Sequence, residues 1–434
     1  MIAGFAPASY VCADQADRPN IILFMADDLG CETIGAYGGE SHATPTLDRM
    51  AATGIRFEHC YAQPLCTPSR AKIMTGIYNV RNYVRFGVLD REQTTFVHLL
   101  KDAGYATCVV GKWQLGKQDD SAQHFGFDES CLWQNTRGHT NKKGCDSRFE
   151  NPSVEINGKP KDYRNGEYGP DVVSDYACDF IERNKDKPFL VYYPMILTHC
   201  PFVPTPDSDE WDPKSPGSKT YRGDPKHFSD MVTYMDKIVG KLATKLDDLD
   251  IRDNTLILFT GDNGTDRVTS TINGKPFAGM KGSMTDGGTR VALIASWPGT
   301  IAKGQVSDDI VDFSDFLPTM CEAAGVEVPT KLTIDGKSFL PQLLGKEGTP
   351  RDWIYIWYSR GGSAGAKVFA RNQRYKLYRT GKFYDVSYDA LEKMPLNVEV
   401  LGDDEKQTHA MLQKALDKYE DARPAHLMGK KKRK

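Results

Sequence analysis

The apolar run at residues 20–26 is the feature that most constrains the fold of this chain. A strand that is apolar on both faces must be covered on both faces, which is typical of the central strand of an open α/β sheet. The run ends in Asp27 and Asp28. Ligands of such sheets bind at the carboxyl ends of the strands, and adjacent carboxylates repel each other unless a cation or hydrogen bonds compensate. The pair therefore indicates a ligand site or, alternatively, an acidic turn.

Other predicted strands also end in polar side chains. They are the segments 105–110 before Lys112, 189–196 before His199, and 255–260 before Asp262 and Asn263. Alone, the lysine would be a surface residue and the histidine a satisfied structural group, but at a strand end beside Asp27 the histidine has a better claim to chemistry. Asp262 and Asn263 form a second oxygen-rich strand end. That second group favours a metal site over an acidic turn at Asp27.

A helix start is predicted in the stretch Cys66-Thr67-Pro68-Ser69-Arg70. Thr67 is a good N-cap residue and Pro68 suits the first helical position, so Cys66 should lie just ahead of the helix N-terminus. The helix dipole and the Arg70 guanidinium favour an anion there and are expected to lower the pKa of the Cys66 thiol. The alternative is a buried cysteine beside an ordinary capped helix.

The stretch at residues 66–70 resembles the maturation signature of the type I sulfatases, in the alkaline phosphatase superfamily. Further segments are similar to that family and follow its order along nearly the whole chain: Asp27-Asp28, 111–116, 198–202, Asp262-Asn263 and 279–283. The resemblance implies an α/β, alkaline-phosphatase-like fold, with a large mixed sheet flanked by helices. A small C-terminal subdomain with an antiparallel sheet and a helix is also implied.

The resemblance implies a sulfatase whose nucleophile is formylglycine, made by oxidation of Cys66. One divalent cation is expected to be bound by Asp27, Asp28, Asp262, Asn263 and the matured Cys66. These hard oxygen ligands favour Ca²⁺ over Zn²⁺, with Mg²⁺ as the alternative. Positive charge from Arg70, Lys112 and Lys281 is expected to offset the charge on the sulfate. His199 is expected to protonate the departing alcohol.

The segment 111–116 departs from the family's pattern at Gln114, where the family has histidine. Glutamine can form hydrogen bonds but cannot titrate. Another base such as His139, or a path polarised by the metal, can replace the missing histidine, or the last step is slower, or the enzyme is impaired. We favour the first two explanations because every other motif position is filled.

Residues 117–169 are polar and rich in glycine and lysine. They are predicted to form an excursion over the active face rather than part of the core. Arg137 and His139 are candidate substrate-binding residues in this segment, because loops of this kind often select the substrate. The alternative is a solvated loop. Together with export, the long polar segment favours a sulfated carbohydrate over an aryl sulfate as substrate.

The chain is expected to comprise a leader at residues 1–17, a catalytic domain at 18–345 and a C-terminal subdomain at 346–434. From Trp353 onward the pattern changes to short aromatic strands followed by a helix. Residues 1–13 are small and apolar and look like the back half of a secretory signal. We therefore expect a periplasmic or secreted protein.

Composition excludes some classes of function. The net charge of −3 gives no reason to expect a nucleic-acid partner, and no apolar run is long enough to span a membrane. The expected partners are a sulfated carbohydrate and a formylglycine-generating maturation enzyme. The cysteines have irregular spacing, although Cys131 and Cys145 flank a polar loop and could pair.

Three other functions remain open at this point. The first is a phosphonate or phosphate ester hydrolase of the same fold that uses the same matured cysteine. The second is a hydrolase that pairs a Cys66 thiolate with His199, which leaves the acidic strand ends unexplained. The third is a non-catalytic protein that binds sulfated glycans with an unmatured Cys66.

Overall fold

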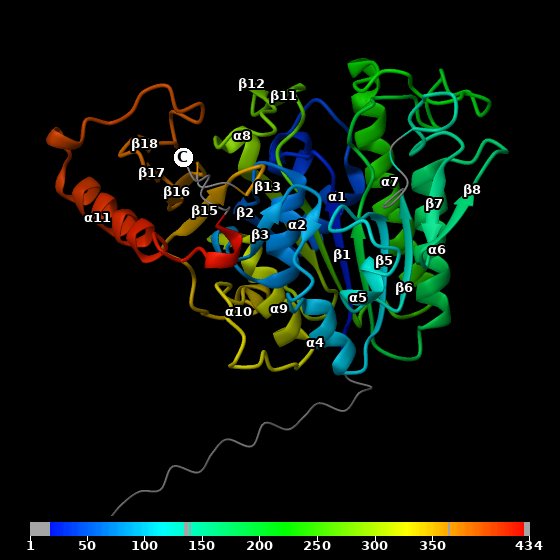
Figure 1. The fold of residues 1–434 in the computed structure, drawn as a ribbon, viewed down its shortest axis with the longest axis horizontal. Coiled ribbons are helices and arrows are strands. Elements are labelled where there is room, and N and C mark those ends of the chain that lie inside the picture. The colour runs from blue at the N-terminus through cyan, green and yellow to red at the C-terminus, as the bar shows by residue number, and fades with distance from the viewer. Residues whose placement is uncertain (1–17, 134–137, 139, 363–364, 429–434) are drawn as a thin grey trace, which may run out of the picture.

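The computed structural model describes residues 18–133, 138, 140–362 and 365–428. In this part of the chain, ten strands form one mixed sheet in the order β14-β2-β13-β10-β1-β9-β5-β6-β7-β8. Figure 1 labels several of these strands, from β2 near the middle to β8 at the right. The strand bounds are β1 Asn20–Ala26, β2 Ile55–Tyr61, β5 Ala106–Lys112, β6 Glu129–Trp133, β7 Ser153–Ile156, β8 Lys159–Asp162, β9 Phe189–Pro194, β10 Thr255–Gly261, β13 Arg290–Ser296 and β14 Gln305–Asp312. The expected leader and the basic C-terminal run at 430–434 lie outside the described residues.

Strand β1 is the central strand that the apolar run predicts, and all seven of its residues are buried. It pairs in parallel with β10 on one side and with β9 on the other, and β9 pairs in parallel with β5. The carboxyl ends of these four strands therefore meet at one edge of the sheet.

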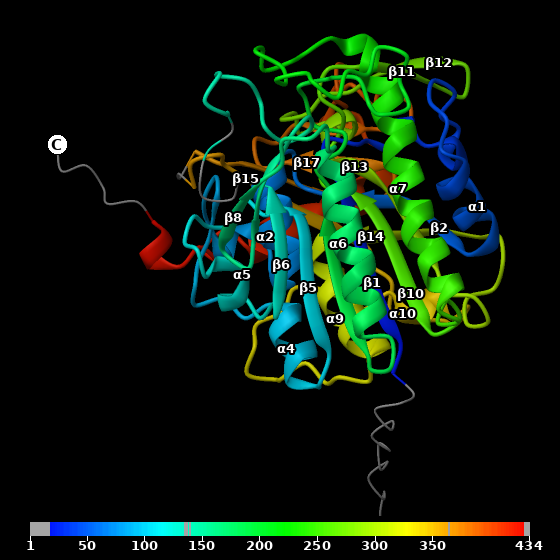
Figure 2. The ribbon, with the colours of Figure 1, turned by 90° about the vertical axis from the view of Figure 1, so that its right-hand side faces the viewer.

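Helices cover both faces of the sheet, as Figure 2 shows for α6 and α7 on the face toward the viewer. Ile22 and Phe24 pack in the core with α1, α6 and α7, whereas Ile21 and Leu23 pack in the opposite core with α2, α4 and α9. The helix bounds are α1 Pro45–Thr53, α2 Cys66–Thr75, α4 Phe96–Asp102, α6 Gly169–Arg183, α7 Phe228–Asp248 and α9 Phe316–Ala323. The side chains of successive residues in a strand point to opposite faces of the sheet, so neighbouring residues of β1 pack in different cores.

The polar segment 117–169 differs in part from the prediction of an excursion outside the core. Its strand β6 pairs in parallel with β5 and is largely buried, and β7 and β8 extend the main sheet from it. The described residues of the loop after β6 line a pocket at the carboxyl edge of the sheet. The run Ser130-Cys131-Leu132-Trp133 is short, and the polar residues around it hide its strand character.

Short elements connect or border the main layers. They are α3 Asn79–Asn82, β3 Tyr83–Arg85, β4 Val88–Leu89, α5 Ser121–His124, β11 Thr269–Ile272, β12 Lys275–Ala278, α8 Asp286–Thr289 and α10 Leu340–Leu343. Of these, β3 with β4 and β11 with β12 form two-stranded antiparallel hairpins. None of the described helices is long and apolar enough to cross a bilayer.

The C-terminal region forms the small antiparallel sheet that was expected, at the left of Figure 1. It consists of β15 Ile354–Tyr358, β16 Lys367–Arg371, β17 Tyr375–Tyr378 and β18 Phe383–Asp385, with the helix α11 Asp403–Lys418 against it. Its aromatic side chains Tyr355 and Trp357 belong to the same hydrophobic core as α2 and α4. The boundary between 345 and 346 stays a prediction.

The cysteines are unpaired in the described part of the chain, and the expected pairing of Cys131 with Cys145 is wrong. Cys131 lies inside strand β6, where its side chain packs in the apolar core with Cys108. The thiol of Cys145 instead lies 3.8 Å from the carbonyl oxygen of Lys143 within its own turn.

A buried ion pair fastens the start of the C-terminal region to the main body. The Arg351 guanidinium donates to both carboxylate oxygens of Asp315 and, at 3.0 Å, to the Tyr78 hydroxyl. Both charged side chains are buried. Removing one member of such a pair leaves an uncompensated buried charge, which is far more costly than losing an exposed pair.

We predict that Arg351→Ala lowers the free energy of unfolding by about 3–5 kcal/mol, because Asp315 is left without its cation. The matched control is Arg91→Ala, which breaks the exposed pair with Asp120 and should change the stability little. Urea unfolding followed by fluorescence measures both. Equal effects of the two substitutions would contradict the importance of the buried pair.

Candidate functional site

Polar side chains from separate strands converge at the carboxyl edge of the sheet. Asp27 and Asp28 follow β1, Lys112 ends β5, His199 follows β9, and Asp262 with Asn263 follows β10. Gly111 allows strands β5 and β9 to lie close together here, because a Cβ atom at that position would lie 2.1 Å from the carbonyl oxygen of Pro194 in β9. Its φ of +109° is also one that other residues rarely adopt.

The oxygen-bearing side chains form one buried cluster. The amide nitrogen of Asn263 donates to Oδ1 of Asp28 over 2.9 Å, and the backbone N–H of Asp28 donates to Oδ1 of Asp262 over 3.0 Å. One oxygen of Asp27, one of Asp262 and the Cys66 sulfur all lie within 4.8 Å of one another. Burial and then the neighbouring charge of Asp27 raise the pKa of Asp262 to about 7. Burial and the crowding of carboxylates thus disfavour the ionised form of Asp262.

This cluster has the donor atoms of a divalent cation site. Among the described residues, neither Oδ1 of Asp27 nor Oδ1 of Asn263 has a hydrogen-bond partner, although both atoms are buried. Buried polar atoms normally have partners, so two carbonyl-type oxygens without one suggest a missing ligand. Carboxylate and amide oxygens suit Ca²⁺ or Mg²⁺. The residues therefore fit a hard divalent cation.

Three cationic side chains surround the same cluster. Lys112 contacts Oδ2 of Asp27 at 2.6 Å, Arg70 contacts Oδ2 of Asp262 at 2.9 Å, and Lys281 donates to Asp28. Burial by itself would raise the pKa values of Asp27 and Asp28. The positive charges, chiefly Lys112 for Asp27 and Lys281 for Asp28, hold both pKa values below their usual range.

Cys66 is the first residue of α2 rather than the residue before it. The N-cap is Leu65, and the Thr67 hydroxyl accepts a hydrogen bond from the backbone N–H of Gly87 instead of capping the helix. The side chain is buried, and burial raises the pKa of the Cys66 thiol. The expected lowering of this pKa is therefore wrong: loss of hydration, together with the negative charges of Asp262 and Asp27, outweighs the nearby cations. A thiol in this state is a poor nucleophile.

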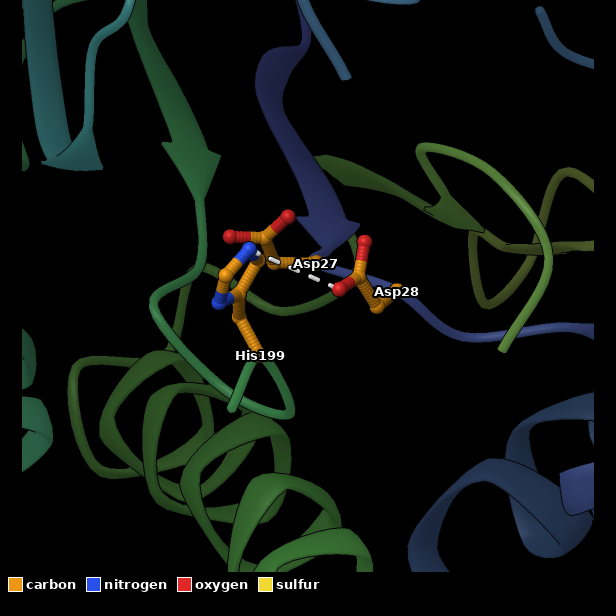
Figure 3. A group of neighbouring side chains, drawn as sticks. All are labelled: Asp27, Asp28 and His199. Carbon is orange, nitrogen blue, oxygen red and sulfur yellow. Dashed lines mark ion pairs between the residues drawn. The ribbon is translucent and has the colours of Figure 1, made fainter. Parts of the chain in front are cut away.

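His199 lies beside the acidic pair in Figure 3, where the dashed line marks its contact with Asp28. Its Nε2 atom is 3.6 Å from Oδ2 of Asp28 and 3.1 Å from Nζ of Lys281. Burial lowers the pKa of His199 to about 3. On the other side of the ring, the Arg148 guanidinium approaches Nδ1 at 2.8 Å. The ring therefore lies between two cations, Lys281 and Arg148.

Arg148 is a site residue that the sequence analysis missed. Its guanidinium also donates to the Cys200 carbonyl and to Asp146, and it lies 4.2 Å from the centre of the Trp133 ring. It comes from the polar loop after β6, in which Arg137 and His139 were the candidates. Those two residues lie outside the described part of the chain. No signal in the local sequence distinguishes Arg148 from its basic neighbours.

Gln114, at the position where histidine was expected, lines the same pocket as Cys66. Its φ of +58° is unusual for a residue other than glycine, asparagine or aspartate. In the part of the chain that the structure describes, its buried Oε1 atom has no hydrogen-bond partner. The side chain thus presents an unused acceptor near the site.

A pocket of about 650 Å³ opens from Cys66 to the surface. Its mouth includes side chains from the loop before α7 and from the end of β15, which the sequence analysis did not connect with the site: Lys219, Tyr221, Arg222, Tyr358 and Arg360. Basic residues outnumber the acidic lining residues Asp146 and Asp266. We name this space the catalytic pocket, and its charge suits an anionic ligand.

Comparison with known proteins finds matching family models and relatives over most of the chain. The sulfatase family model matches residues 19–326, and a model described as "N-sulphoglucosamine sulphohydrolase, C-terminal" matches residues 280–422. Dog N-acetylgalactosamine-6-sulfatase is 34% identical over 384 residues, which cover 80% of this chain and 70% of that protein. Human arylsulfatase A is 32% identical over 403 residues, with 84% and 75% covered.

A solved structure has the same architecture. It is Ps i-CgsB in complex with k-i-k-neocarrahexaose, with a TM-score of 0.77, 25% sequence identity and 94% of both chains covered. The match of the sulfatase model to most of the chain, together with relatives above 30% identity, decides the family. The chain belongs to the sulfatase family and is a sulfuric ester hydrolase.

Proposed function

We propose that this chain hydrolyses sulfate esters of a sulfated carbohydrate, with Cys66 oxidised to formylglycine and one bound divalent cation. The observation that carries the proposal is the convergence of Cys66 with the buried oxygens of Asp27 and Asp262 at the carboxyl edge. The cation would be held by Asp27, Asp28, Asp262, Asn263 and the matured residue 66. Ca²⁺ is the proposed ion, with Mg²⁺ as the alternative, since ligand type alone does not separate them.

The bound cation supplies a Lewis acid and the hydrated aldehyde of formylglycine supplies a hydroxyl nucleophile. The chain's own residues bind and orient the sulfate. Lys112 and Lys281 lie at the floor of the catalytic pocket, where their ammonium groups can offset the negative charge of the ester. Arg70 donates to Asp262 and to the Lys112 carbonyl, and these two hydrogen bonds fix the position of Lys112 relative to the acidic cluster.

His199 is the proposed proton donor to the departing alcohol oxygen, from its Nε2 atom. It lines the catalytic pocket beside Lys281. The sulfate ester brings negative charge into this pocket, which favours the protonated imidazole over the neutral form. The Cys200 carbonyl lies 2.5 Å from Nδ1 and can accept its proton in the protonated ring, and Arg148 donates to the same carbonyl and so fixes its position.

The carbohydrate part of the proposal rests on the polar lining of the pocket and on the similarity to N-acetylgalactosamine-6-sulfatase, whose name specifies a sugar. Arg137 and His139 remain candidate substrate ligands. We further propose export through the leader at 1–17 and maturation by a formylglycine-generating enzyme. The divisions at 18–345 and 346–434 are also part of the proposal.

Each of the three rival functions can be distinguished from the proposed one. A hydrolase with a Cys66 thiolate is disfavoured by the raised pKa of that thiol. A phosphonate or phosphate ester hydrolase would use the same groups, so comparison of sulfate and phosphonate esters at saturating concentration separates the two. Tight glycan binding without sulfate release would favour the non-catalytic alternative.

We predict that Ca²⁺ added to chelator-stripped protein raises the midpoint of thermal unfolding, because the ion relieves carboxylate repulsion only in the folded state. Saturation at a hundredfold excess over Kd corresponds to about 2.7 kcal/mol. Asn263→Ala should reduce the gain by removing one ligand oxygen. The control is Asn254→Ala, an exposed asparagine just before the other end of β10. If Asn263→Ala and the control respond alike to Ca²⁺, the proposed site is wrong.

We predict that Gln114→His leaves the turnover of an aryl sulfate unchanged or raises it, because histidine adds a titratable group where glutamine only forms hydrogen bonds. Gln114→Ala should lower kcat by up to about tenfold, the effect of one lost hydrogen bond. Gln118→Ala, on the exposed stretch that follows, is the control. Complete loss of activity in Gln114→His would show that glutamine has a positive role.

A further inference from the structure

A second cavity of about 990 Å³ lies beside the catalytic pocket, and we call it the lysine cavity. Hydrogen bonds between separate segments hold its walls together. Asn141 donates to the Pro216 carbonyl over 2.9 Å, and Asn151 donates to the carbonyls of Pro213 and Ser215 over 3.1 and 3.2 Å. The backbone N–H of Gly166 in turn donates to Oδ1 of Asn151. The cavity is therefore built by cross-linked segments.

The charge of the lysine cavity is positive. Lys142, Lys143 and Lys214 line it, are exposed, and form no ion pair with any described residue. Its fourth cation, Arg164, is compensated by Asp162 at 2.9 Å. The apolar side chains in the lining are prolines. Such a surface suits a hydrated, anionic ligand and offers little to an apolar one.

The lysine cavity adjoins the catalytic pocket. Thr140 lines both spaces, the three residues after it line the lysine cavity, and Gly144 lines the catalytic pocket. On the facing loop, Pro216 lines the lysine cavity and Ser218 the catalytic pocket. A hydrogen bond of 2.7 Å from the Asp146 N–H to the Ser218 carbonyl joins the two loops. One extended ligand can therefore enter both.

We propose that the lysine cavity binds a second anionic group, a sulfate or a carboxylate, on another sugar unit of the same glycan chain whose sulfate ester enters the catalytic pocket. This inference rests on the proposed function and adds to it that the substrate is an anionic oligosaccharide or polymer rather than a monosulfated sugar. The three unpaired lysines select for the second charge. The polar cross-links keep them in place without a bound ligand.

The test measures binding by calorimetry in full-length protein with Cys66→Ala, so that no turnover is needed. The variant carries Lys142→Ala, Lys143→Ala and Lys214→Ala; the matched control carries Lys185→Ala and Lys187→Ala. These two exposed lysines precede β9, at the opposite edge of the sheet. Ligands are hexasaccharides with one terminal sulfate ester whose other units are sulfated, carboxylated or neutral. 4-Nitrophenyl sulfate serves as a ligand too short to reach the lysine cavity.

The affinity of the triple variant for an anionic hexasaccharide should fall by about tenfold, as expected for three exposed charge contacts. The loss should shrink at high salt and should be absent with the neutral hexasaccharide and with the aryl sulfate. Loss with only one anionic hexasaccharide would identify the group as sulfate or carboxylate. Arginine in place of all three lysines should restore binding.

Equal affinity of the triple variant and the control for both anionic hexasaccharides would overturn the inference, as would an equal loss with the neutral hexasaccharide. Thermal unfolding of each variant checks that the walls remain folded. The proposed function fails separately, if matured protein releases no sulfate from any ester. The binding results in the Cys66→Ala protein would still decide the role of the lysine cavity.

Discussion

The structure of the site depends on the compensation of buried negative charge at the carboxyl edge of the sheet. Asp27, Asp28 and Asp262 are buried close together, an arrangement that would cost several kcal/mol per unpaired charge. Lys112, Lys281 and Arg70 each contact one of them. Compensation is incomplete, because two oxygens of the cluster have no hydrogen-bond partner among the described residues. These two oxygens without partners distinguish a ligand site from a set of structural ion pairs.

The sheet geometry brings these groups together. Four parallel strands end at one level, as shown by the pairing of Ala26 with Gly261 and of Met25 with Pro194. Strand β2 runs antiparallel to β13, which runs antiparallel to β10, so its carboxyl end lies at the same edge and leads to Cys66. The sheet therefore places Cys66, the acidic cluster and His199 at the same edge, without long loops between the strands and the site.

Much of this arrangement could be predicted because its residues follow strongly apolar strands. The predicted strand at residues 20–26 and the structure agree residue for residue, and the residues after it begin the site. Arg148 and Arg360 could not be found this way, because they belong to an irregular loop and to the end of a distant strand. The pKa of Cys66 was misjudged because burial cannot be read from a helix start. Strand β6 was hidden by its polar neighbours.

The central claim is that Cys66 is a precursor of formylglycine rather than a thiol that acts as such. The most direct measurement is the mass of the peptide that carries residue 66, after expression of the chain together with a formylglycine-generating enzyme. The account predicts the mass of the aldehyde or its hydrate at that position. An unmodified cysteine, from a partner enzyme that matures a control sulfatase in the same cells, would contradict it.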